Sequence, residues 1–245
     1  MRFGKISYLN LVPFDIFIKR YPTTSAFKAF LNHHKSYPAK LNKEFLFKRI
    51  DAGFISSIAG MKARKTNSGI VAYGAVWSVI VLPKPTKSDY QSASSNALAQ
   101  ILGVKGEVLI GDRALRHKLS GAEYIDLGAK WWEKHRLPFV FGLLCFNKHG
   151  DFYKKISARF NAKRIYIPQY LLEIYARNSG IAKRDILEYL THIHYKITPK
   201  GKAALFRFYR AVRIMRITPP PHTPCVNQSV IVRKRVAKCV IRDFC

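Results

Sequence analysis

The chain has 245 residues, with 43 Lys and Arg against 14 Asp and Glu, which gives a formal net charge of +29. Hydrophobic residues make up 48% of it, which excludes a disordered, self-repelling chain and is enough for a core in one large domain or two smaller ones. No stretch approaches the roughly 18 to 20 consecutive apolar residues of a membrane-spanning helix, and the N-terminus lacks the apolar run of a secretory signal. We therefore expect a soluble, cytoplasmic protein that does not bind membranes.

The basic residues are spread along the chain, singly or in pairs such as Lys19-Arg20 and Lys163-Arg164. Clustered cations bind nucleic acids through their phosphates. However, no zinc finger, basic zipper or RNA-binding aromatic signature accompanies these residues. A solvated basic surface is favoured over a nucleic-acid site, and a positive field also concentrates small anionic substrates.

The first quarter of the chain predicts short strands and helices in turn. Residues 3–9 are apolar and end at a turn, which indicates a buried strand. Ser25 is the expected cap of a helix whose apolar residues follow at helical spacing. A second helix is expected over residues 38–50, and a short strand over residues 54–55.

The middle of the chain continues this alternation. Residues 70–82 form the longest β-like run, residues 92–102 a capped helix, and residues 107–110 a buried strand. Residues 137–146 are continuously apolar, as expected of a strand buried on both faces, and residues 151–216 have a helical pattern. The order predicts an α/β protein with mainly parallel sheets.

The C-terminal residues 217–245 differ from the rest. They begin with a Pro-rich stretch, are basic, and hold Cys225, Cys239 and Cys245, whereas Cys145 lies in an apolar run. The tail is either a functional extension or a non-native one, and we assign it no chemistry. No C-x-x-C pair or zinc spacing is present, so free thiols in a reducing compartment are expected.

The reactive side chains form no familiar catalytic motif. The sequence has no phosphate-binding loop, dinucleotide-binding turn, zinc-protease motif or nucleophile elbow. Two pairs of histidines are close in sequence: His33-His34 and His192 with His194. We expect both pairs at the surface and not in a metal site. Asp112 and Asp126 are the acids nearest the ends of expected strands, where carboxylates usually cap helices or pair with a neighbouring Arg.

Small polar residues gather where the expected strands end. They are Ser7, Asn10, Ser56, Ser57, Ser78, Ser94, Ser95 and Asn96. Ligands of open α/β sheets lie beyond such strand ends, where helix N-termini attract anions. Helix caps and turns are the commoner role of Ser and Asn there. The residues alone therefore indicate a two-lobed α/β protein and allow a site for a small anion.

Several motifs occur along the chain in the order found in a known protein family. They are Gly4-x-Ile6-Ser7-Tyr8-Leu9-Asn10-x-x-Pro13-Phe14, Ile50-Asp51-Ala52-Gly53-x-Ile55-Ser56, Leu109-Ile110-Gly111-Asp112-x-Ala114-Leu115, Tyr124-x-Asp126-Leu127-Gly128-x-x-Trp131, Leu137-Pro138-Phe139-Val140-Phe141 and Leu187-x-Tyr189-Leu190-Thr191-x-Ile193-x-Tyr195. Over residues 2 to about 213 the chain resembles the chorismate dehydratase family of the futalosine route to menaquinone.

The resemblance implies a two-lobed fold of the type 2 periplasmic-binding-protein kind. Lobe 1 would comprise residues 1–78 and 147–216, and lobe 2 residues 79–146, with the crossing strands at 76–82 and 139–146. Lobe 2 would be abridged, because only a short segment joins its serine-rich helix to the next strand. The tail from residue 217 has no counterpart in the family.

The resemblance also implies a function and a site. Chorismate, a dianion, would lose water to give 3-[(1-carboxyvinyl)oxy]benzoate, with neither a metal nor an organic cofactor. Asn10 would be catalytic, Ser56, Ser78, Ser95 and Asn96 would bind substrate, and Asp112 would stabilise its turn. Two alternatives stay open: the sister 1,4-dihydroxy-6-naphthoate synthase, which is expected to use a second-lobe histidine (here His117 or His135), and a non-catalytic small-anion-binding protein.

Overall fold

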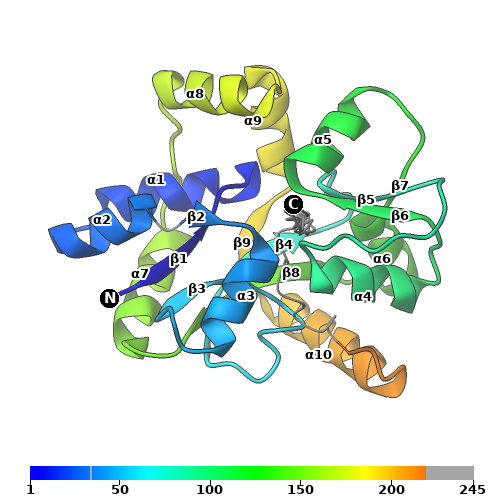
Figure 1. Ribbon diagram of the computed structural model, residues 1–245, viewed down its shortest axis with the longest axis horizontal. Coiled ribbons are helices and arrows are strands. Elements are labelled where there is room, and N and C mark those ends of the chain that lie inside the picture. The colour runs from blue at the N-terminus through cyan, green and yellow to red at the C-terminus, as the bar shows by residue number, and fades with distance from the viewer. Residues whose placement is uncertain (34, 219–245) are drawn as a thin grey trace, which may run out of the picture.

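The computed structural model describes residues 1–33 and 35–218, which form two lobes, each built on a β-sheet (Figure 1). The six-stranded sheet of lobe 1 has the order β2-β1-β3-β8-β4-β9. Its strands are β1 (Phe3–Ile6), β2 (Lys35–Ser36), β3 (Ala52–Ser56), β4 (Lys65–Ala72), β8 (Phe139–Phe146) and β9 (His194–Lys196). The three-stranded sheet of lobe 2 has the order β6-β5-β7, with β5 (Val79–Leu82), β6 (Glu107–Ile110) and β7 (Ile125–Asp126).

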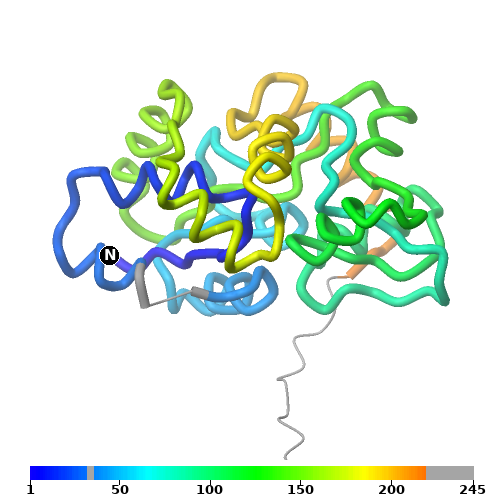
Figure 2. The backbone as a smooth tube through the Cα atoms, turned by 90° about the horizontal axis from the view of Figure 1, so that it is seen from above, coloured from blue at the N-terminus to red at the C-terminus, as the bar shows by residue number. Residues whose placement is uncertain are grey.

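Helices surround both sheets, and Figure 2 shows from above that the two lobes lie side by side. Around the six-stranded sheet lie the short 3-10 turn η1 (Leu9–Leu11), α1 (Val12–Arg20), α2 (Ser25–His33), α3 (Pro38–Leu46), α7 (Gly150–Asn161), α8 (Gln169–Ser179) and α9 (Lys183–Thr191). Lobe 2 carries α4 (Ala93–Leu102), α5 (Gly111–Leu119) and α6 (Leu127–His135). The last helix, α10 (Pro199–Ile214), packs against both β8 and α4 and so joins the lobes.

The expectation of mainly parallel sheets is wrong. Strand β1 pairs in parallel with β2 and β3, but β8 runs antiparallel to β3 and β4, β9 runs antiparallel to β4, and both neighbours of β5 are antiparallel to it. Strand β5 is buried throughout and β8 at all but one position. Their continuous apolar runs therefore report burial on both faces and not the direction of the strands.

The β-like run at residues 70–82 is two strands and not one. The chain leaves the lobe 1 sheet at Ala72 and enters the lobe 2 sheet at Val79. Between them the backbone turns through positive φ at Gly74 (+105°) and Trp77 (+61°). Left-handed backbone cannot continue a β-strand, so the run is interrupted although its residues are mostly apolar.

Helix boundaries were predicted with mixed success. Ser92 caps α4 as expected, because its Oγ accepts a hydrogen bond from the Ser95 amide at 3.2 Å. The cap of α2 is Thr24, whose Oγ1 accepts from the Phe27 amide at 3.3 Å, and not Ser25. Helix α3 ends at Leu46, short of residue 50, and the backbone at Lys48 is left-handed (φ +58°). Strand β9, bonded to β4, interrupts the stretch expected to be helical.

The predicted tail lies outside the described residues from residue 219 onward, and with it Cys225, Cys239 and Cys245. Cys145 is fully buried in β8, and burial raises the pKa of its thiol to about 12. Within the described part of the chain, no helix combines the length and apolar character that crossing a membrane requires. The lobe bounds implied by the resemblance stay a prediction.

Candidate active site

A cavity of about 60 Å³ lies between the two sheets, where β1, β3 and η1 of lobe 1 face β5, α4 and α5 of lobe 2. Apolar side chains form much of its wall. Its polar wall consists of Tyr8, Asn10, Ser56, Ser78, Ser92 and Ser95. Four of the five predicted site residues therefore line one cavity although they are far apart in the sequence, and the fifth, Asn96, does not.

Asn10 contributes an unpaired acceptor to this cavity. Its side-chain Oδ1 is buried, and no group in the described residues forms a hydrogen bond to it. Its backbone is fixed from two sides: the Tyr195 hydroxyl donates to the Asn10 carbonyl at 2.6 Å, and the preceding amide of Leu9 donates to Asp112 Oδ1 at 3.2 Å. Leaving a buried amide oxygen unpaired costs free energy, so this atom is suited to meet a ligand.

The cavity serines share one hydrogen-bond arrangement. Asn42 Nδ2 donates to Ser56 Oγ at 2.8 Å, the Tyr189 hydroxyl donates to Ser78 Oγ at 2.8 Å, and Ser92 Oγ donates to Ser95 Oγ at 2.8 Å. A hydroxyl has one hydrogen to donate and lone pairs to accept with. In these three bonds each Oγ is the acceptor, so the hydroxyl hydrogens of Ser56, Ser78 and Ser95 are left to face an acceptor such as a carboxylate.

Helix starts contribute a positive potential at the cavity wall. Among the described residues, no Lys, Arg, His, Asp or Glu lines the cavity. Three helices begin at its wall: α3 at Pro38, α4 after its cap Ser92, and α5 at Gly111. The free N–H groups and the positive dipole end at each helix start favour an anion.

Asn96 holds a loop instead of lining the cavity. Its Oδ1 accepts from the Asp89 amide at 2.9 Å, and its Nδ2 donates to the Asp89 carbonyl at 2.8 Å. The amide therefore fixes the segment before α4, which includes Gln91 and Ser92. Its predicted role in substrate binding is not visible in this geometry.

The two expected structural carboxylates have different partners. Asp126 caps α6 by accepting from the Ala129 amide at 2.9 Å, and it also accepts from the amides of Val76 and Trp77, so it anchors the turn between the lobes. Asp112 holds Leu9 of the opposite lobe, beyond its own turn. Burial raises the pKa of both carboxyls, against their backbone hydrogen bonds.

Further contacts close the cavity between the lobes. The Tyr8 hydroxyl donates to Gln91 Oε1. A Cβ added to Gly111 would lie 2.9 Å from the Tyr8 ring, and the left-handed backbone at this glycine (φ +65°) also disfavours a side chain. Ser94 Oγ lies 3.0 Å from Ser57 Oγ and accepts from the Ile58 amide at 3.0 Å. These contacts connect the two lobes on either side of the cavity.

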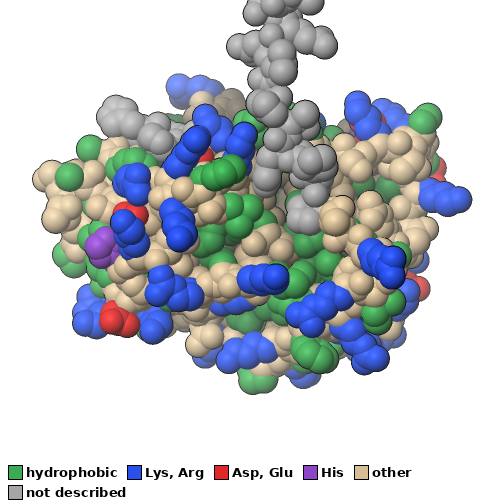
Figure 3. All heavy atoms as spheres, turned by 60° about the horizontal axis from the view of Figure 1, so that its bottom comes forward, with side chains coloured by type: hydrophobic (Ala, Val, Ile, Leu, Met, Phe, Trp, Pro, Cys, Tyr) green, Lys and Arg blue, Asp and Glu red, His purple; other side chains and the backbone are tan. Residues whose placement is uncertain are grey.

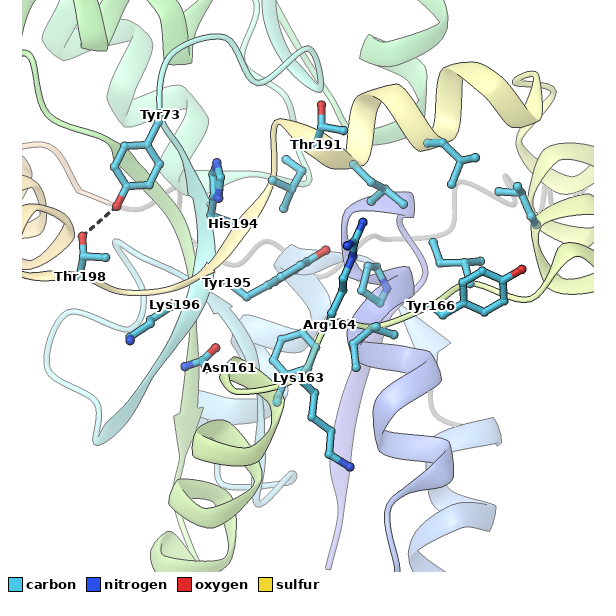
Figure 4. A pocket seen from close by; sticks show the side chains of 18 of the residues that line it. Tyr73, Asn161, Lys163, Arg164, Tyr166, Thr191, His194, Tyr195, Lys196 and Thr198 are labelled. Atoms are coloured by element: carbon cyan, nitrogen blue, oxygen red, sulfur yellow. Dashed lines mark hydrogen bonds between the residues drawn. The ribbon is translucent and has the colours of Figure 1, made fainter.

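A second, wider groove of about 970 Å³ lies on lobe 1, away from the predicted site residues (Figure 4). Lys163, Arg164 and Lys196 line it, together with apolar residues of α8 and α9. None of the five predicted site residues lines this groove. Tyr195 belongs to its wall and is also the residue that contacts the Asn10 carbonyl.

Sequence reasoning missed the residues that hold the site, namely Asn42, Gln91, Tyr189 and Tyr195. Asn42 carried a local signal, because it sits beside Leu41 on the buried side of a helix, where an amide needs partners. The two tyrosines lie in a motif of the resemblance, but their contacts join residues more than 100 positions apart.

Comparisons with known proteins identify the family of the chain. The menaquinone biosynthesis family matches residues 87–213. The chorismate dehydratase of Campylobacter jejuni subsp. jejuni serotype O:23/36 (strain 81-176) is 42% identical over 222 residues, which cover 89% of this chain and all of that protein.

Solved structures give the fold. Protein AF1704 from Archaeoglobus fulgidus superposes with a TM-score of 0.64 at 12% identity, over 89% of this chain and 98% of that one. The alkanesulfonate-binding protein SsuA from Xanthomonas axonopodis pv. citri, bound to MOPS, has a TM-score of 0.52 at 12% identity, over 89% and 94% of the two chains. The fold is thus that of the periplasmic binding proteins, as expected, and by sequence the chain belongs to the chorismate dehydratase family of menaquinone biosynthesis.

Proposed function

We propose that this protein is a hydro-lyase that eliminates water from chorismate and releases 3-[(1-carboxyvinyl)oxy]benzoate. The observation that carries the proposal is the cavity between the lobes, where the buried Oδ1 of Asn10 has no hydrogen-bond partner among the described residues. The 42% identity to a chorismate dehydratase over its whole length supports the choice of substrate. We place the reaction in the cytoplasm.

The cavity would bind a dianion through neutral hydrogen-bond donors and not through cationic side chains. The Oγ atoms of Ser56, Ser78 and Ser95 accept in their hydrogen bonds with Asn42, Tyr189 and Ser92, which leaves their hydroxyl hydrogens for a ligand. Three helix starts add positive potential at the same wall. We assign the three serines to the carboxylates of chorismate.

The reaction needs little from the protein beyond positioning. Loss of one ring hydrogen and the neighbouring hydroxyl makes the ring aromatic, so the product supplies much of the driving force. In the part of the chain that the structure describes, the cavity wall carries no carboxylate, imidazole or amine that could act as a base. We therefore assign the proton to a carboxylate of the substrate itself, and to Asn10 the polar contact with the reacting region.

The basic surface does not favour a nucleic-acid partner. The face in Figure 3 shows Lys and Arg side chains dispersed over both lobes and mixed with hydrophobic and neutral ones. A dispersed positive charge fits the steering of a small anion toward the cleft.

The sister naphthoate synthase is less well supported. It was expected to use a histidine of the second lobe, but neither His117 nor His135 lines the cavity. His117 is near the Glu123 carbonyl, and His135 near Arg207, at the end of α6.

The test is product analysis by liquid chromatography and mass spectrometry, with a protein-free control for spontaneous decay of chorismate. The proposal predicts protein-dependent loss of one water and formation of the enolpyruvyl benzoate. Chorismate that is bound and recovered unchanged would instead identify a binding protein. If chorismate is neither bound nor converted, the substrate assignment is wrong.

A further inference from the structure

Two tyrosines of the segment that runs from α9 into β9 form hydrogen bonds with residues that line the cavity. Tyr189, on α9, is 1% exposed, and its hydroxyl donates to Ser78 Oγ at 2.8 Å. Tyr195, on β9, donates to the Asn10 carbonyl at 2.6 Å. Tyr189 does not line the cavity and neither does Tyr195, so each acts on a ligand only through its partner.

Two long-range hydrogen bonds fix the Asn10 turn. One is the bond from Tyr195, and the other runs from the Leu9 amide to Asp112 Oδ1 at 3.2 Å. The backbone bonds of η1 itself are short-range, such as the bond from the Leu11 amide to the Tyr8 carbonyl at 3.1 Å. The Tyr195 ring packs 5.0 Å from the Phe160 ring, centroid to centroid, which fixes the donor. In Figure 4 the Tyr195 side chain points away from the strand and across the groove. This hydroxyl is therefore a long-range restraint on where Asn10 lies.

Tyr189 orients the hydroxyl of Ser78 in a similar way. Because it donates to Ser78 Oγ, it turns the serine hydrogen away from itself and so makes Ser78 a donor toward the cavity. Burial raises the pKa of both tyrosines above the usual range, so both hydroxyls stay protonated donors at neutral pH.

We infer that Tyr189 and Tyr195 are positioning residues of the dehydration: Tyr195 sets the location of Asn10, and Tyr189 sets the hydrogen-bond direction of Ser78. The inference rests on the proposed function. It predicts separate kinetic signatures, because Asn10 is assigned to the chemical step and Ser78 to binding of a carboxylate.

The test uses single hydroxyl deletions in the full chain, with kcat and KM for chorismate measured on folded protein. Tyr195→Phe is expected to lower kcat roughly 10-fold with KM little changed, because a misplaced reacting group affects the transition state more than binding. Tyr189→Phe is expected to raise KM roughly 10-fold, the equivalent of one charge-assisted hydrogen bond.

Tyr175→Phe is the matched control. Tyr175 on α8 is another partly buried tyrosine of lobe 1 and donates to Asp15 Oδ2 at 2.9 Å, away from the cavity. It loses the same hydroxyl and one hydrogen bond, so kcat and KM should stay within about twofold of wild type if position in the site is what matters. Equal effects of all three substitutions on kcat and KM would overturn the inference in favour of a general structural role.

A double-mutant cycle with Ser78→Ala adds a readout that stability alone does not move. If Tyr189 acts through Ser78, Tyr189→Phe raises KM no further in the Ser78→Ala background. Multiplying effects would overturn this half of the inference. A wild-type chain without turnover overturns the proposed function and the inference with it, whereas an active wild type with unchanged tyrosine variants overturns the inference alone.

Discussion

The two lobes build their halves of the cavity in different ways. In lobe 2, Ser95 is held by Ser92, three residues earlier in the same helix start. In lobe 1, Ser56 is held by Asn42 of another element, and Asn10 by Tyr195, 185 residues away. One half of the site is thus a local capping motif, whereas the other half exists only once the six-stranded sheet has formed.

A buried carboxylate in each lobe also has different partners and a different pKa shift. Asp15 in lobe 1 lies 2.5 Å from Lys5 Nζ and 3.3 Å from Lys19 Nζ. Burial alone would raise its pKa, but Lys5, Lys19 and Tyr175 together lower it below the usual range. For Asp126, burial outweighs the backbone hydrogen bonds and raises the pKa. Ion pairs hold the first acid, and backbone amides hold the second.

The largest effect on stability is expected from Asp15→Asn. The substitution leaves the nearly buried Lys5 ammonium without its carboxylate, a loss of about 3–5 kcal/mol in the free energy of unfolding. Urea denaturation measures it. Asp151→Asn, at a carboxylate that is 92% exposed beside Lys154, is the control and should leave the urea midpoint unchanged. A small change at Asp15 would contradict the assigned ion pair.

The pH dependence of the same free energy separates the two acids. A lowered pKa makes Asp15 stabilising above the ordinary carboxyl pKa of about 3.9, and this contribution is lost as the pH falls through the lowered value. A raised pKa gives Asp126 the opposite sign, because its contribution is lost as the pH rises through the raised value. In Asp15→Asn the free energy of unfolding should therefore fall less steeply as the pH is lowered than in wild type. In Asp126→Asn it should fall more steeply. The reverse pattern would contradict the assignment.

Asn10→Ala should lower kcat about 100- to 1000-fold, as loss of one preorganised polar group in an active site does. The melting temperature should stay near that of wild type, because the deleted Oδ1 has no hydrogen-bond partner among the described residues. Asn161→Ala, in the groove of lobe 1, is the matched amide deletion and should keep full activity. Near-normal kcat in folded Asn10→Ala would remove Asn10 from the mechanism.

Two buried asparagines allow the lobes to be compared directly. Asn42 and Asn96 each form two hydrogen bonds with fixed groups, so each substitution by Ala should cost about 1–3 kcal/mol of stability. KM for chorismate should rise more in Asn42→Ala, because Ser56 loses the donor that orients it. A larger rise in Asn96→Ala would show that Asn96 touches the substrate, as the resemblance implies.

The smallest effect is expected from Ser94→Ala. Its hydroxyl joins the lobes through Ser57 and the Ile58 amide, and deleting it should lower the free energy of unfolding by about 1 kcal/mol. Thermal unfolding measures the change. A loss as large as that of Asp15→Asn would mean that the contact between the lobes, and not the lobe 1 core, dominates stability.

The sequence predicted best where the signal was local. The cap of α4 at Ser92, the strand at residues 107–110 and the polar residues at strand ends follow from near neighbours. The split at residues 73–78 was missed, because the carboxylate that binds this turn, Asp126, lies 50 residues further along. The pairing of β9 with β4 and the direction of β8 depend on distant strands, so hydrophobic pattern could not determine them.

The most direct test of the site is a crystal structure of Asn10→Ala soaked with chorismate. Our account predicts chorismate between the lobes, with its carboxylates against Ser56, Ser78 and Ser95 and its ring next to the deleted side chain. Chorismate bound in the basic groove beside Lys163 and Arg164, with the cavity between the lobes empty, would contradict it.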